Sequence, residues 1–132
     1  MAIQYSTDLR NARSNQIQTI AGASPIFRFY TGTKPASLSD AVTGTLLAEI
    51  TLPTVWLGTA GNGVVTQEGV WTTSSALATG TPGYFRIFKS DGVTPVMQGA
   101  IPVDLSGGST PAITAGSAVT IGPGFTLTDG NA

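Results

Sequence analysis

The hexapeptide PIFRFY, from Pro25 to Tyr30, is the stretch around which the rest of the sequence is organised. A second copy, GYFRIFK, runs from Gly83 to Lys89 and has the same Phe-Arg centre. Each copy leads into a turn that contains Gly, Thr and Pro, and then into a second apolar segment, 46–52 or 96–103. This order predicts two hairpin-like units that pack on one core.

Alternation within the first copy places Phe27 and Phe29 on one face of a strand, and Ile26, Arg28 and Tyr30 on the other. Because both faces carry apolar groups, we expect a central strand that is covered on both sides. Arg28 and Arg86 hold matching positions in the two copies. They are either edge residues with solvated head groups or partners in matched salt bridges, between the copies or between subunits.

The composition is that of one small domain with little surface charge. The 132 residues are 41% hydrophobic, which is enough to close a single core. Charged residues make up only 10%, against a usual share of about 25%. A surface this neutral favours a protein whose faces contact other subunits. The alternative is an ordinary soluble β domain with hydroxyl-rich faces.

Several classes of function are disfavoured by what the sequence lacks. A net charge of −1 offers no basic field for nucleic acid. Cysteine and histidine are absent, which excludes disulfides, thiolate nucleophiles, zinc sites with nitrogen or sulfur ligands, and imidazole bases. No run of about 18 apolar residues occurs, and the N-terminus has no basic segment followed by an apolar one. We therefore expect no cofactor, no metal, no membrane contact and no signal-peptide export.

One short helix is predicted, from about residue 8 to residue 20. Ser6 to Asp8 can accept the first free backbone N–H groups, and Ala21-Gly22 can end the helix. Its apolar residues at mostly helical spacing are Leu9, Ala12, Ile17 and Ile20. Two interpretations stay open. Leu9, Ile17 and Ile20 either cap an open end of the β domain or form a docking arm for a neighbouring subunit.

The remaining chain reads as short strands separated by turns and loops. Asn62-Gly63 predicts a type I′ hairpin turn, residues 31–45 predict an exposed polar loop, and 104–111 form a Gly- and Ser-rich loop. Eight to ten strands at regular spacing indicate a mainly β fold, an antiparallel β-sandwich or jelly roll with one short N-terminal helix. The predicted organisation is an N-terminal arm, 1–22, and a single β-sandwich domain, 23–132.

No catalytic constellation is visible. The seven carboxylates are spread singly through the chain, at Asp8, Asp40, Glu49, Glu68, Asp91, Asp104 and Asp129. The glycine-rich stretch 58–63 lacks the Gly-Lys-Ser/Thr ending of a phosphate loop and reads as a turn. Trp56 and Trp71 either pack in the core or form an exposed sugar-binding platform.

Several segments together are similar to a family of small virion or prophage proteins of tailed bacteriophages. The segments are Leu9-Arg10-Asn11-Ala12-Arg13 with Ile17 and Ile20, Gly22-Ala23-Ser24, Tyr30-Thr31-Gly32-Thr33-Lys34-Pro35, Leu46-Leu47-Ala48-Glu49, Tyr84-Phe85-Arg86 and Gly130-Asn131-Ala132. The resemblance covers most of the chain. It implies a late structural gene product and lends no active-site residues.

The resemblance and the composition lead to one functional expectation. We expect a non-enzymatic virion structural protein, a capsid decoration or cement subunit on the head lattice, assembled in the host cytoplasm. Its partners would be the major capsid protein or other virion subunits, and it would be a homo-oligomer. The alternatives are a head-to-tail collar or minor tail component, and a carbohydrate-binding module. The candidate contact residues are Leu9, Arg10, Arg13, Ile17, Ile20, Arg28 and Arg86.

Overall fold

A computed structural model of the chain describes residues 4–101, 112–121 and 126–128. The elements in these ranges are α1 (Thr7–Ala21), β1 (Ile26–Tyr30), β2 (Leu46–Thr51), β3 (Val64–Thr66), β4 (Trp71–Thr73), β5 (Tyr84–Phe88), β6 (Pro95–Ala100), β7 (Val119–Ile121) and β8 (Thr126–Thr128). The strand pairings are antiparallel, and the fold is mainly β with one helix, as predicted. The loop expected at 104–111 lies outside the described residues.

The two copies of the repeated motif form the centre of a four-stranded sheet. Its strand order is β2-β1-β5-β6, so β1 and β5, which contain the two Phe-Arg motifs, lie side by side. Each central strand also pairs with the apolar segment that follows it, β1 with β2 and β5 with β6. The prediction of two hairpin-like units on one core is therefore confirmed.

The strand register relates these two units by an approximate two-fold axis normal to the sheet. Arg28 lies opposite Arg86 in the β1–β5 pair, so the axis passes between them. Within the units, Arg28 lies opposite Glu49, and Arg86 lies opposite Gln98. Both units even shift register at the same place, between the first and second residues after the arginine. The internal repeat is thus a repeat in space as well as in sequence.

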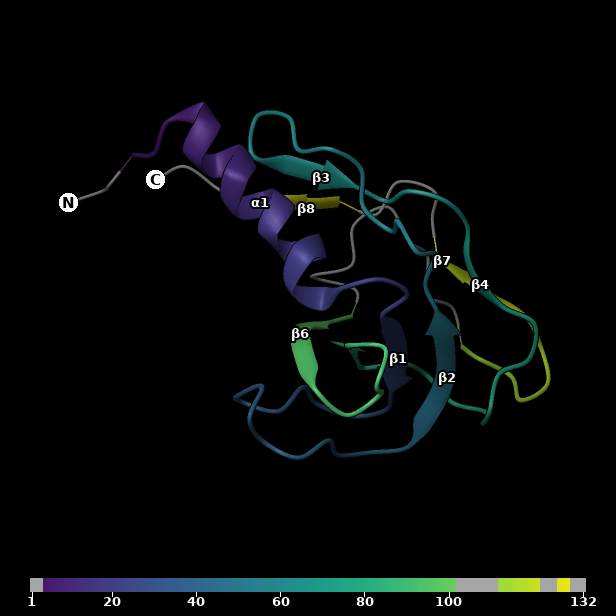
Figure 1. Cartoon of the computed structure of the whole chain (residues 1–132). Helices are drawn as coiled ribbons and strands as arrows, with labels where there is room; N and C mark the ends of the chain where they lie inside the picture. Colours follow the sequence, from purple (N-terminus) through teal and green to yellow (C-terminus); the bar gives the residue numbers. More distant parts are fainter. Residues whose placement is uncertain (1–3, 102–111, 122–125, 129–132) are drawn as a thin grey trace.

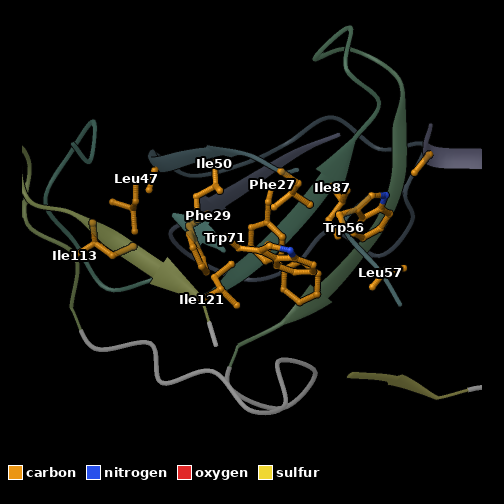
Figure 2. Packing of buried hydrophobic residues seen from close by; sticks show 14 of the residues in the cluster. Phe27, Phe29, Leu47, Ile50, Trp56, Leu57, Trp71, Ile87, Ile113 and Ile121 are labelled. Carbon is orange, nitrogen blue, oxygen red and sulfur yellow. The ribbon is translucent and has the colours of Figure 1, made fainter. Parts of the chain in front are cut away.

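The core fills the space between the four-stranded sheet and two short strand pairs, β3–β8 and β4–β7. Figure 2 shows Phe27 and Phe29 of the sheet facing Trp71 and Ile121 of the β4–β7 pair. The Phe27 and Phe85 rings stack at 4.9 Å across the two-fold axis. The ring centroids of Trp56 and Trp71 lie 5.8 Å apart. This two-layer core makes the arrangement sandwich-like.

The ends of α1 and the turn before β3 follow the predicted chemistry. Ser6 Oγ accepts a hydrogen bond from the Leu9 N–H, and Gly22 ends the helix with a φ of 79°. The helix therefore spans one residue more at each end than predicted. Asn62 and Gly63 have φ values of 52° and 75°, which confirms the type I′ turn because that turn needs two positive values.

The loop between β1 and β2 crosses the outer face of the four-stranded sheet. It is mostly exposed, as expected for residues 31–45, but several hydrogen bonds hold it in place. Tyr84 Oη donates to the Thr43 carbonyl, and Gln98 Nε2 donates to the Pro35 carbonyl. The outer face of the sheet is therefore covered at its centre, as the apolar residues on both faces of β1 predicted.

Candidate functional site

Helix α1 attaches to the β domain through its polar side. Side-chain oxygens of Asn11, Asn15 and Gln18 accept hydrogen bonds from backbone N–H groups of the segment 57–63, at 2.7, 3.0 and 2.8 Å. Ser14 Oγ, which is buried, donates to a carbonyl of the same segment. Figure 1 shows the helix running alongside β3, which follows this segment. The helix side chains thus provide the hydrogen-bond partners that a neighbouring strand would otherwise provide to these backbone groups.

This attachment corrects one expectation about the helix. Leu9 and Ile20 do not cap an open end of the sandwich, because they are 45% and 58% exposed. Only Ile17 packs partly against the core. At 100° per residue, Leu9 and Ile20 lie on the side of α1 opposite to Asn11 and Gln18. The backbone N–H groups of the segment 57–63 require hydrogen-bond acceptors, so α1 packs against them with its amide side chains. The side of α1 that carries Leu9 and Ile20 therefore faces outward.

We call Leu9, Arg13 and Ile20 the outer helix face. Arg13 lies within the stripe that Leu9 and Ile20 define, and its guanidinium carbon sits 4.8 Å from the centre of the Tyr5 ring. Arg10 points elsewhere, since its Nη2 donates to the Asn62 carbonyl of the protein's own hairpin at 2.9 Å. Of the five candidate contact residues on the helix, these three share one outward stripe.

Arg28 and Arg86 form a separate cluster on the outer face of the four-stranded sheet. Arg28 Nε donates to Glu49 Oε2 at 2.7 Å, and its guanidinium lies over the Phe88 ring. Burial disfavours the charge of Arg28, but the hydrogen bonds and charges of Glu49 and Tyr30 together outweigh that effect and raise its pKa. Neither arginine is an edge residue, because β1 and β5 are the two central strands.

Arg86 has the equivalent geometry without the carboxylate. It is only 3% exposed, and its Nε and Nη2 both donate to Gln98 Oε1, at 3.2 and 2.7 Å. Its Nη1 donates to the Asp40 carbonyl at 2.9 Å. Within the described ranges, the hydrogen-bond acceptors of this guanidinium are therefore neutral. Among the described residues, Arg28 and Arg86 therefore do not form the expected matched salt bridges between the copies, because the ion pair of Arg28 is with Glu49 of its own unit.

Each arginine also fixes the turn of the opposite unit. Arg28, from the first unit, donates through Nη1 to the Gly92 carbonyl in the β5–β6 turn at 2.9 Å. Arg86, from the second unit, donates to Asp40 in the β1–β2 loop. These reciprocal bonds obey the same two-fold relation as the strands, and they hold the two loops over the sheet.

A cavity of about 520 Å³ lies over the two arginines. We call it the arginine slot. Its other lining residues include Tyr30, Asp40, Val42, Phe88, Val93 and Pro95. Burial raises the pKa of Tyr30, although the hydrogen bond and charge of Arg28 act in the opposite direction. The Tyr30 hydroxyl is therefore protonated at neutral pH and available as a donor.

Other candidate chemistry does not assemble. Trp56 and Trp71 are fully buried, so they offer no sugar-binding platform. Across residues 4–101, 112–121 and 126–128, no three His, Cys, Asp or Glu side chains group together in a way that could hold a metal ion. In the same ranges, no helix is long and apolar enough to cross a membrane.

No protein-family model, curated protein or solved structure matches this chain. The polar stripe Asn11, Asn15 and Gln18 was missed at the sequence level, although its spacing of four and three residues was visible. Apolar periodicity does not reveal this stripe, because the helix docks through amide side chains.

Proposed function

We propose that the chain is a non-enzymatic structural subunit of a tailed-phage particle, a decoration or cement subunit that attaches to the head lattice through the outer helix face. The observation that carries this proposal is the orientation of α1. Its polar side is occupied by the protein's own 57–63 segment, and its apolar side is turned outward. A helix that exposes Leu9 and Ile20 on its outer side can offer these residues to another subunit.

The energetics of burial favour such a contact. Burying one Leu or Ile side chain contributes about 1.5–3 kcal/mol, and both Leu9 and Ile20 are about half exposed in the single chain. A surface that is poor in charge lowers the cost of removing water between subunits. The resemblance to virion proteins and the charge-poor surface support a structural role over an enzymatic one.

The decisive experiment compares two double variants in a particle-binding assay. Particles that lack the protein are incubated with Leu9→Ser/Ile20→Ser, or with the matched control Val70→Ser/Leu77→Ser, which alters two residues exposed to 70% and 60% away from the helix. We expect the helix variant to lose at least about 10-fold in affinity, since burying the exposed halves of the two side chains contributes roughly 1.5–3 kcal/mol. The control should bind as the wild type does, and both variants should keep the wild-type Tm. Equal binding by the two variants would contradict the proposal.

Reconstruction of the particle distinguishes the head from the neck and tail. A copy of the chain on each capsomer is the result expected for a decoration subunit. A ring confined to the neck or tail would instead make the chain a collar or minor tail component. The mass of the free protein in solution tests separately whether it is a homo-oligomer.

A further inference from the structure

We propose that the arginine slot is a binding site for a carboxylate that carries a small apolar body. The proposal is independent of the outer helix face and of the function proposed above. It rests on the chemistry of the slot, where Arg28 and Arg86 lie beside each other under apolar walls.

The internal repeat provides the first argument, because the two arginines are equivalent in space but not in charge balance. Arg28 faces the carboxylate of Glu49 on its neighbouring strand. Arg86 faces the amide of Gln98 at the equivalent position. In the first unit the arginine therefore faces a carboxylate, and in the second unit the equivalent position has no acidic side chain.

Because Arg86 is buried, the lack of a carboxylate on its neighbouring strand has a cost in free energy. A buried charge is costly unless it is paired with an opposite charge, and the neutral acceptors on Arg86 offset only part of that cost. A carboxylate that entered the slot would add a charge-assisted hydrogen bond to the neutral ones that Arg86 makes with Gln98 and the Asp40 carbonyl. Nε and one N–H of Nη2 already bond to Gln98 Oε1, and one N–H of Nη1 bonds to the Asp40 carbonyl, so the carboxylate would bind through the remaining N–H groups of Nη1 and Nη2.

The remaining lining residues define the rest of the ligand. Val42, Phe88, Val93 and Pro95 offer apolar surface, and the protonated Tyr30 hydroxyl offers a further donor. A volume of about 520 Å³ falls within the usual range for small-molecule pockets. Because the carboxylate of Asp40 also lines the slot, it repels a doubly charged phosphate more than a singly charged carboxylate, so the slot favours the carboxylate.

Asp40 sets a limit on affinity. It also lines the slot, and its Oδ2 accepts a hydrogen bond from the Ser37 N–H at 3.1 Å. Its negative charge opposes an incoming anion, so we expect binding in the millimolar to high-micromolar range. The Asp40→Asn variant should bind the carboxylate more tightly than the wild type.

An NMR titration of the wild-type chain tests the site directly. The probes are N-acetyl-leucine, which carries a free carboxylate, N-acetyl-leucinamide, which differs only in having an amide there, and inorganic phosphate. We expect N-acetyl-leucine alone to shift the Arg28 and Arg86 Nε–H signals and the Val93 methyl signals in a saturable manner. Equal shifts with the amide, stronger binding of phosphate, or no saturable shift at these signals would overturn the proposal.

Two variants show whether the slot itself is the binding site. Val93 is 77% exposed at the slot, so Val93→Trp should fold, occlude the slot and weaken N-acetyl-leucine binding at least fivefold. The matched Val70→Trp variant should bind as the wild type does. Gln98→Glu supplies the missing acid and should weaken binding at least tenfold. If the Val93→Trp variant binds N-acetyl-leucine with wild-type affinity, the carboxylate binds elsewhere and the proposal is wrong.

Discussion

Asp91 fixes the β5–β6 turn, in which a backbone carbonyl accepts a hydrogen bond from Arg28. Its Oδ1 accepts hydrogen bonds from the Val93 and Thr94 N–H groups, at 2.8 and 2.9 Å, and its Oδ2 accepts one from Thr94 Oγ1. Gly92, the next residue, provides the acceptor for Arg28 Nη1. The sequence predicts a turn after the second copy of the motif, but the bond from this turn to an arginine on another strand depends on tertiary contacts.

The same carboxylate makes the stability of the domain depend on pH. The hydrogen bonds from Thr94 and Val93 lower the pKa of Asp91 from 3.8 to about 2. Because the folded-state pKa is below that of the unfolded chain, this contribution is complete above about pH 4 and is lost as the pH falls toward 2. We expect the difference in unfolding free energy between wild type and Asp91→Asn to shrink over that window. Denaturant titrations from pH 2 to pH 6 measure it, and a constant difference would refute the assignment.

At the level of elements, α1 is held by amide side chains rather than by apolar packing. Its bounds were predictable from local chemistry, since Ser6 and Gly22 cap it as expected. The side that packs was not predictable from hydrophobic periodicity, because the decisive groups are backbone donors of the segment 57–63. The Asn62-Gly63 turn is part of the segment that presents these donors to the helix.

Removing one of these amides should therefore destabilise the domain. Asn11→Ala leaves the Gly63 N–H without its acceptor, and Gln18→Ala does the same for Leu57. An unsatisfied buried donor costs about 1–3 kcal/mol, which for a domain of this size lowers Tm by roughly 3–10 °C. Thermal unfolding measures the shift, and amide hydrogen exchange at Gly63 should accelerate in the Asn11→Ala variant. Gln16→Ala, on the exposed side of α1, is the matched control and should leave both values unchanged.

At the scale of the whole molecule, the internal repeat organises the sheet. The repeat, the central position of its strands and the two hairpin-like units were all predictable, because they follow from matched local patterns. The strand order that brings Arg28 opposite Arg86 was not, since pairing between distant strands is set by the whole core. Glu49 and Gln98 occupy equivalent positions under the two-fold relation between the units. The sequence does not show this relation, so it could not reveal that one arginine faces an acid and the other an amide.

The function proposed for the whole molecule depends on which surface meets the particle. A photo-crosslinking amino acid is placed at position 9 on the outer helix face, or at position 70, which is exposed on another part of the domain. The proteins are assembled into particles, and the purified particles are irradiated. We predict an adduct with another virion protein from position 9 and none from position 70. An adduct from position 70 alone, or absence of the chain from purified particles, would contradict attachment through the outer helix face.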